Sequence, residues 1–255
     1  MVSAYKGLFA IYISVSFASI IAAAIVSTYY PESAFSSFVF AILIICITMI
    51  ILSRIARRKF ADEVLVHFKN CQIHEFMEKL EHRMGRKHGV MRSAYNYLAA
   101  MGHSALGNTE DVYACAQKIT ARSHRTEYLR RMIDYYVTLE QFEAAKPYIA
   151  EISQLAAKQK EQYKQVLEDY LINVDIHIRM SKGDVSGAEE FYTDYLINRG
   201  ELPLISRVSF SYSLGLVLMM KGENERAKEY FEIAAKNGGD TKYQLRAAEK
   251  LAELG

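Results

Sequence analysis

The side chains best suited to chemistry in this sequence are His74, Glu78 and His82, which recur every four residues. On a helix that spacing places all three on one face, a geometry that can bind zinc. The stretch HEFME begins like a zinc-protease motif but has Glu78 where that motif has its second histidine. Lys79 and Arg83 lie at the spacing of ordinary helical ion pairs, which favours a solvated charged face. We therefore expect no metal here and keep a metal-dependent hydrolase as an alternative.

No other pattern in the sequence predicts a reaction centre. His67 and Cys71 also lie one helical turn apart, and a metal is again the less simple interpretation. The sequence has no phosphate-binding glycine loop, no Gly-x-Ser-x-Gly elbow and no paired CxxC. Its three cysteines, Cys46, Cys71 and Cys115, are widely spaced, which is typical of reduced thiols. We expect a protein that is not an enzyme and needs no cofactor.

The elements that carry these side chains are preceded by two uncharged apolar runs, residues 7–28 and 33–53. At about 1.5 Å per residue they form roughly 33 and 31 Å of helix, close to the ~30 Å hydrocarbon core of a bilayer. Neither run contains Asp, Glu, Lys, Arg or His, which argues against a proton path or transport. A cleaved signal peptide is the rival interpretation of the first run. The apolar core of a signal peptide, however, has only about 7–15 residues. We predict a transmembrane hairpin.

The charges that flank the two runs predict the orientation of this hairpin. The turn at residues 29–32 contains a proline and no Lys or Arg, whereas Lys6 precedes the first run. Four cations at the membrane surface follow the second run: Arg54, Arg57, Arg58 and Lys59. Because cytoplasmic segments carry the excess of Lys and Arg, we expect both termini in the cytoplasm. The predicted domains are the hairpin with its basic segment, residues 1–59, and a soluble cytoplasmic domain, residues 60–255.

Small residues recur every four positions along the first run, at Ser14, Ala18 and Ala22. They leave a shallow groove that permits close backbone approach. We expect this groove to pack against the second run. A contact with another membrane protein, or with a second copy of the chain, is the other interpretation.

Charge in the soluble domain is nearly balanced, with 30 Lys and Arg against 28 Asp and Glu after residue 53. No global field therefore recruits nucleic acid, which we do not expect as a partner. One local exception is the basic stretch at residues 82–88. It either contacts anionic lipid or forms a solvated loop, and we favour the loop.

The soluble domain is predicted to be all-helical. Apolar residues recur at three- and four-residue spacing, and the period-two alternation of a strand is nearly absent. Turn residues divide it at positions 70, 85–89, 107–108, 139–141, 183–184, 199–200, 222–223 and 238–240. Similar segments follow every second turn: GNTEDV at 107–112, TLEQFEAA at 138–145, KGDVSGA at 182–188 and KGENERA at 221–227. This self-similarity predicts antiparallel helix pairs.

The clearest copy runs from Tyr212 to Ala235. Small and large residues alternate in it at Leu214, Gly215, Ala227, Phe231 and Ala234, with a Lys-Gly-Glu-Asn turn at 221–224. The pattern resembles the tetratricopeptide repeat (TPR) family over about residues 90–239, with a degenerate pair at 60–84. Equivalent small residues lie 33, 43 and 39 positions apart, against about 34 in the family, so longer helices or inserted loops are expected.

The resemblance implies an α-solenoid, since one helical hairpin cannot bury its apolar face alone and several must stack. Residues 241–254 are expected to form a C-terminal capping helix. Its buried stripe is predicted to comprise Tyr243, Leu245, Ala248, Leu251 and Ala252.

In the resembled family the first helix of each pair lines a concave groove that binds a partner. When the repeats of this chain are aligned with the family at their turns, this rule places nine residues in the groove: Tyr97, Met101, Arg130, Asp134, Tyr170, Asn173, His177, Tyr212 and Met219. Aromatic and Arg side chains often dominate binding energy, although packing between helix pairs is the alternative for each tyrosine. The Lys and Asn residues with which some relatives clamp a terminal carboxylate are not recognisable here.

These features predict a membrane-anchored, non-catalytic adaptor or scaffold that binds a protein or peptide partner through the groove. Two alternatives remain. One is a regulatory subunit of a larger membrane assembly, contacted through the hairpin. The other is the metal-dependent hydrolase that would use His74, Glu78 and His82.

Overall fold

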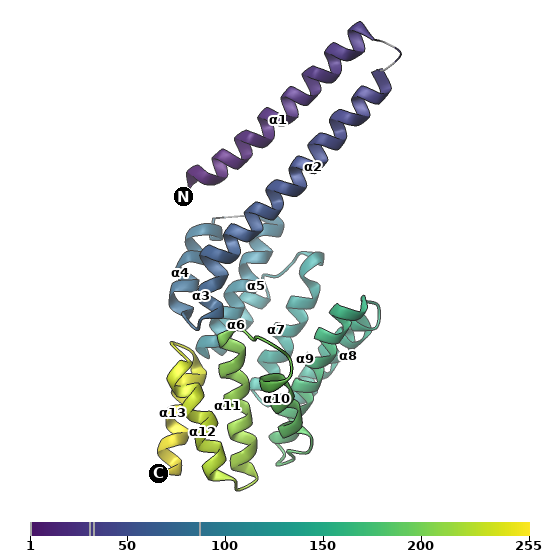
Figure 1. The fold of residues 1–255 in the computed structure, drawn as a ribbon. Coiled ribbons are helices and arrows are strands. Elements are labelled where there is room, and N and C mark those ends of the chain that lie inside the picture. The colour runs from purple at the N-terminus through teal and green to yellow at the C-terminus, as the bar shows by residue number, and fades with distance from the viewer. Residues whose placement is uncertain (1, 31, 33, 87) are drawn as a thin grey trace. The chain divides into compact units, whose positions relative to one another are not determined.

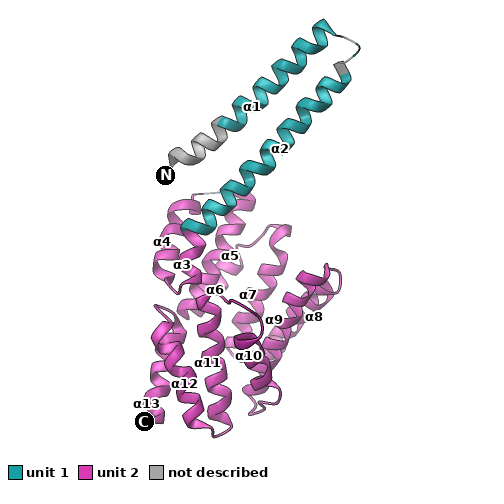
Figure 2. Ribbon diagram, in the orientation of Figure 1, with its two compact units in different colours: residues 1–63 teal, residues 64–255 magenta. Residues whose placement is uncertain are grey.

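The structure is a computed structural model that describes residues 2–30, 32, 34–86 and 88–255, with side chains for residues 11–30, 32, 35–86 and 88–255. All regular elements in these residues are helices (Figure 1), which confirms the all-α prediction. The chain divides into two compact units, Met1–Glu63 and Val64–Gly255 (Figure 2). They are termed here the hairpin unit and the helix-stack unit.

Two long apolar helices, α1 (Val2–Tyr29) and α2 (Ala34–Phe60), pack against each other in the hairpin unit. The stretch Ile11–Tyr29 has a mean hydropathy of 2.0, and the helical stretch that begins at Phe35 reaches 2.8. By length and composition both are able to cross a membrane. Hydroxyl groups bond within their own helix: Ser19 donates to the Val15 carbonyl and Thr48 to the Ile44 carbonyl, both at 2.8 Å. These hydroxyl groups are therefore hydrogen-bonded without water, as a group inside a bilayer must be.

The face that α1 presents to α2 differs from the predicted one. Ser14 and Ala18 are exposed, whereas Ala23 of α1 and Ala41 of α2 are 4 % and 7 % exposed. The prediction that the small-residue stripe packs against the second helix is therefore wrong for Ser14 and Ala18. Small residues occur on several faces of α1, so their spacing alone does not select the face in contact.

The helix-stack unit consists of short helices joined by tight turns. It contains the end of a π-helical turn, η2 (Ala61–Leu65), and α3 (Val66–Lys69), α4 (Ile73–Met84), α5 (Gly89–Leu106), α6 (Thr109–Ala116), η3 (Arg122–His124), α7 (Arg125–Thr138), α8 (Phe142–Ala156), α9 (Glu161–Met180), α10 (Ala188–Ile197), α11 (Leu204–Met220), α12 (Asn224–Asn237) and α13 (Lys242–Leu254).

These helices stack as pairs (Figure 1). Consecutive helices contact each other from α4 to α9 and again from α10 to α13. Alternate helices also meet: α5 contacts α7, α7 contacts α9, and α11 contacts α13. Between α7, α8 and α9 the core side chains Leu129, Ile133, Ile152 and Leu167 are each 0 % exposed. The α7–α8 pair therefore buries its apolar face against α9, as the repeat pattern predicts for stacked helix pairs.

Close approach within the α11–α12 pair depends on a glycine. A Cβ placed on Gly215 would lie 2.7 Å from Cε1 and 2.8 Å from Cδ1 of Phe231. Phe231 and Ala227 are both 0 % exposed. The absent side chain of Gly215 is thus what allows the Phe231 ring to pack on the α11 backbone.

The two ends of the helix-stack unit are joined by Asp240, in the turn between α12 and α13. Its carboxylate accepts hydrogen bonds from the backbone N–H groups of Ile73 at 2.6 Å and His74 at 2.8 Å. These are free N–H groups in the first turn of α4, where a negative charge is also favoured by the helix dipole. The last helices of the unit therefore hold the start of α4.

The predicted stripe of α13 is wrong at Leu245, which is 61 % exposed, and at Ala248 and Ala252, which are also exposed, while Ala247 is 0 % exposed. The Tyr243 ring lies 5.8 Å from that of Tyr212 on α11. Tyr243 and Ala247 are one turn apart, so α13 turns this face to α11 and α12. The sequence alone did not show which of two partly apolar faces would be covered.

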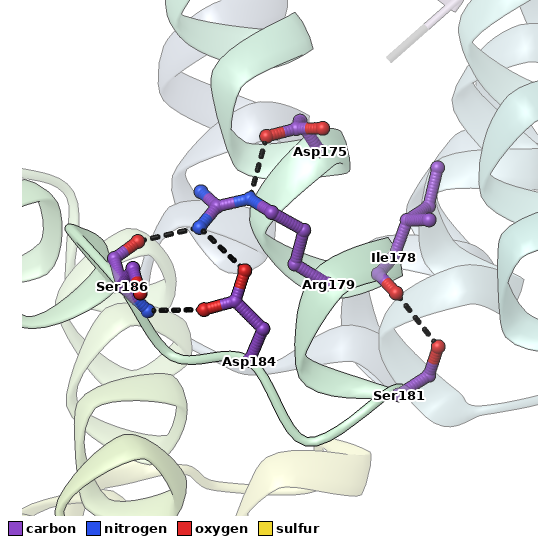
Figure 3. A network of polar contacts seen from close by, with 6 residues as sticks. All are labelled: Asp175, Ile178, Arg179, Ser181, Asp184 and Ser186. Carbon is purple, nitrogen blue, oxygen red and sulfur yellow. Dashed lines mark hydrogen bonds and ion pairs between the residues drawn. The ribbon is translucent and has the colours of Figure 1, made fainter.

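The turn from α9 to α10 is held by Arg179 (Figure 3). Its Nε donates to Asp175 at 2.8 Å, and another guanidinium nitrogen donates to the Ser186 carbonyl at 2.5 Å. Asp184 accepts from the Ser186 N–H at 2.9 Å and lies 3.6 Å from the same guanidinium. The hydrogen bonds from Ser186, and then Arg179, lower the pKa of Asp184. This ionised carboxylate and guanidinium fix the turn that leads into α10.

Candidate partner-binding surface

Three of the predicted groove residues meet where α7 lies beside α9. Arg130 and Asp134 are one turn apart on α7 and therefore share a face. The Tyr170 hydroxyl lies 2.8 Å from Asp134 Oδ1 and 3.0 Å from the Arg130 carbonyl oxygen, either of which can accept its proton. The Arg130 guanidinium carbon lies 4.7 Å from the centre of the Tyr170 ring, as in a cation–π contact. The predicted proximity of these three residues is thus seen in the structure.

Arg131 completes this cluster and was not predicted from the sequence. It is 8 % exposed, and one of its terminal nitrogens lies 3.0 Å from Asp134 Oδ2. Asp134 therefore uses one oxygen for Tyr170 and the other for Arg131. The Nε atoms of Arg130 and Arg131 are buried and have no hydrogen-bond acceptor among the described residues. The sequence does show that Arg131 lies three residues before Asp134, the spacing of a helical ion pair. Because such pairs are common on solvated helix faces, this spacing does not identify Arg131 as part of a buried cluster.

Burial and charge set the protonation of the cluster. Burial, followed by the charge of Asp134, raises the pKa of Tyr170 well above its usual range. The phenol therefore stays a hydrogen-bond donor at neutral pH. Burial also lowers the pKa of His177; Asp134 opposes this shift and Lys242 adds to it. His177 is consequently neutral at pH 7, and the cluster contains two guanidinium groups against the Asp134 carboxylate.

Two predicted residues lie on α5, which contacts α7. The Tyr97 ring lies 5.4 Å from that of His124, and burial raises the Tyr97 pKa, with Glu127 adding to the shift and Arg131 opposing it. Met101, one turn further along α5, is half-buried. Since α5 contacts α7, the surface continues from α9 across α7 to α5.

The remaining three predicted residues face elsewhere or are enclosed. Asn173 accepts a hydrogen bond from the Tyr192 hydroxyl at 3.0 Å and so faces α10. Tyr212 is 9 % exposed, with its ring 5.9 Å from Phe231 and 5.8 Å from Tyr243. Met219 is half-buried near the end of α11. The candidate surface accordingly centres on α5, α7 and α9, and is defined by Tyr97, Met101, Arg130, Arg131, Asp134, Tyr170 and His177.

The candidate metal ligands do not converge in the described part of the chain, where no three His, Cys, Asp or Glu side chains are placed to hold an ion. The His74 side chain is 75 % exposed and its Nε2 lies 4.0 Å from Asp240. His67 Nδ1 lies 2.9 Å from the Gln72 amide oxygen and 3.2 Å from a Glu75 carboxylate oxygen. This arrangement offers no support for the hydrolase alternative.

The predicted membrane-surface cations lie at the end of α2. Arg57 donates to the Ser53 carbonyl and hydroxyl oxygens, both at 3.3 Å. Arg58 lies 4.0 Å from Asp62. Arg54 and Lys59 are on the same helix, so all four cations follow the apolar stretch directly.

Comparison with known proteins adds no family assignment: the chain matches no protein-family model, no curated protein and no solved structure. Its function is therefore argued from geometry.

Proposed function

We propose that this protein is a membrane-anchored, non-catalytic adaptor that binds a protein or peptide partner on the α5–α7–α9 surface of a TPR-like cytoplasmic helix stack. The observation that carries the proposal is the convergence of Arg130, Arg131, Asp134 and Tyr170 at the α7–α9 contact. Aromatic and Arg side chains held rigid by their neighbours are the groups that most often anchor a bound chain.

The partial exposure of Arg130 and Asp134 supports a binding role, because each side chain is 27 % exposed. A peptide laid against the surface carries a carbonyl oxygen and an N–H group at almost every residue, which these two side chains can bind. The half-buried Met101 and Tyr97 extend the same surface with apolar area.

The hairpin supplies the anchor in this proposal. Its two apolar helices have bilayer length, and the cations Arg54, Arg57, Arg58 and Lys59 follow the second of them, which favours a cytoplasmic helix stack. Holding the stack at a membrane raises its local concentration near other membrane components without any new contact.

Site-specific photo-crosslinking tests the binding surface. A photoreactive residue at Met101 should give a discrete protein adduct in intact cells, and Arg130→Ala should weaken that adduct while the far-UV spectrum is unchanged. The matched control places the probe at Ile233, an apolar side chain on α12 that is 37 % exposed. Equal labelling from Met101 and Ile233 would contradict the proposal. Tyr212→Ala is an unsuitable probe because its ring is buried and its loss would destabilise the fold. Tyr170→Ala is unsuitable because it removes the hydrogen bond to Asp134 that joins α9 to α7.

A second candidate, a subunit of a larger membrane assembly, is favoured by one feature of the hairpin. A recess of about 360 Å³ opens between α1 and α2, lined by residues that include Ser19, Ala22, Ser36, Ser37 and Phe40. Small residues there permit close approach of another helix. Extraction in mild detergent followed by identification of copurifying proteins tests it: Ala22→Leu, which fills the recess, should lose a hairpin-bound subunit and leave the adduct at Met101 intact. Copurification that is unchanged by Ala22→Leu would contradict this candidate.

A further inference from the structure

Three turns at one end of the helix stack share a basic composition. Their described residues, 82–86 with 88–92, 117–125 and 157–160, contain three, three and two Lys or Arg and no Asp or Glu. The turns at the other ends of these helices, residues 107–111 and 139–143, contain four acidic residues and no Lys or Arg. The surface formed by the three basic turns, α4–α5, α6–α7 and α8–α9, is termed the basic end.

Contacts in the structure tie these turns to one end of the stack. Asn96, in the first half of α5, donates to the Lys118 carbonyl at 3.0 Å, and the Ala121 N–H donates to the Ser93 hydroxyl at 3.2 Å. Arg125, at the start of α7, donates to Glu151 in the last half of α8 at 2.7 Å. Because each helix returns antiparallel to the one before it, Lys118, Arg122, Lys158 and Lys160 lie at the end where α5 begins.

The α4–α5 turn adds an apolar tip to the basic end. Val90 and Met91 are 59 % and 50 % exposed, and the side chains of Arg86 and His88 beside them are also exposed. Residue 87 lies outside the described residues. Arg92 donates to the Gly85 carbonyl at 2.5 Å and so holds the turn in place. Exposed apolar side chains surrounded by cations are the composition of surfaces that bind anionic bilayers.

The covalent path of the chain links this end of the helix-stack unit to the proposed anchor by a short segment. A turn at residues 70–72 joins α3 to α4, and these two helices contact each other. The α4–α5 turn is therefore at the end of the helix-stack unit where the chain enters it, at Val64. Val64 follows Ser53, the last residue of the second apolar run, by eleven positions, or about 17 Å of helix. The covalent link between the apolar run and the helix-stack unit is therefore short.

We propose that the basic end docks on anionic lipid at the membrane surface, with Val90 and Met91 placed among the headgroups. Lipid is favoured over a protein partner because Lys and Arg predominate across three separate turns, the apolar tip is small, and the covalent link to the apolar run is short. The inference rests on the proposed hairpin only for this short covalent link to a membrane. It goes beyond the adaptor role, because it fixes which end of the stack faces the membrane.

Tryptophan fluorescence tests the docking directly, since the sequence contains no tryptophan. The full-length chain with Val90→Trp is reconstituted in vesicles of phosphatidylcholine alone, or with about one-third phosphatidylserine, each with and without brominated acyl chains as quencher. We expect a blue shift and quenching with phosphatidylserine, and their loss at about 0.5 M salt, where charges are screened. The matched control is Leu139→Trp, at the opposite end of the stack and 38 % exposed, which should remain unquenched in both vesicles.

Two double variants that remove the same charge distinguish the effect of the basic end on docking from the effect of net charge. Arg86→Gln with Lys118→Gln should abolish quenching of the tryptophan at position 90, whereas Lys182→Gln with Lys236→Gln, which removes the same charge from other exposed sites, should not. If the tryptophan at position 90 is not quenched in phosphatidylserine vesicles, lipid docking is overturned. A protein would then be the partner that binds this surface.

Carbonate extraction of the same vesicles reports on the anchor independently. A chain that resists extraction but shows no quenching at position 90 contradicts docking alone. A chain that is quenched yet extractable contradicts the anchor alone.

Discussion

At the scale of single residues, Tyr170 joins α9 to α7 through one buried hydrogen bond to Asp134 at 2.8 Å. Tyr170→Phe removes the donor and leaves one oxygen of a charged, half-buried acceptor without its partner. We expect a loss of about 2 kcal/mol in the free energy of unfolding, typical of a hydrogen bond to a charged group. Urea unfolding followed by circular dichroism measures it. Tyr163→Phe, an exposed tyrosine on the same helix, should change stability by almost nothing, and equal losses in the two variants would refute this role of Asp134.

His177 should make the helix stack less stable in acid. Burial, assisted by Lys242, lowers its pKa in the folded chain, while the unfolded chain binds the proton near pH 6.5, at about the ordinary value. The unfolded state therefore binds more protons as the pH falls below about 6.5, and the free energy of unfolding decreases over that window. His177→Gln should flatten this part of the stability profile. If the free energy of unfolding of His177→Gln falls as steeply as that of the original chain between about pH 6.5 and 5, groups other than His177 cause the loss of stability in acid.

The sequence predicted correctly which groove residues lie together where the spacing along one helix determines it. Arg130 and Asp134 share a face because they are four positions apart, and Tyr170 followed from the repeat pattern. Asn173 lies only three positions beyond Tyr170, yet it bonds to Tyr192 on α10. That difference depends on the rotation of α9 about its axis, which is set by packing with two neighbours and cannot be inferred from spacing.

At the scale of elements, the close packing of α11 on α12 depends on Gly215. Gly215→Ala places a Cβ within 2.8 Å of two atoms of the Phe231 ring. We expect destabilisation of about 1–3 kcal/mol from the displaced ring, although alanine is the better helix former by about 1 kcal/mol. Thermal unfolding measures the loss. In a Phe231→Leu background the same change should cost much less, and an equal cost in both backgrounds would show that the ring is not the cause.

Element boundaries were predictable where the sequence contains residues that break helices. The turns at 107–108, 139–141 and 222–223 fall between helices as expected. The breaks after Ala116 and after Ala156 were not predicted. Residues 157–160, Ala-Lys-Gln-Lys, all favour helix, so the end of α8 is set by the return of α9 over the core rather than by local preference. These unpredicted breaks include two of the three turns of the basic end.

At the scale of the whole molecule, composition alone indicated two apolar helices followed by an all-helical domain, because uncharged runs and helical periodicity are local properties of the sequence. The contact from Asp240 to Ile73, at the start of α4, spans 167 positions. A linear repeat pattern contains no signal for such a closure. Both proposals, partner capture and lipid docking, depend on a hairpin that crosses the bilayer and leaves the helix stack on the cytoplasmic side.

A topology reporter tests that dependence most directly. Alkaline phosphatase, which is active only outside the cytoplasm, is fused after Gly255 of the full chain, and a second fusion places it in the turn at residues 29–32. The account predicts an inactive enzyme at Gly255 and an active one in the turn, with both fusions resistant to carbonate extraction. Active enzyme after Gly255, or extraction of the chain by carbonate, would contradict a cytoplasmic helix stack held by a membrane hairpin.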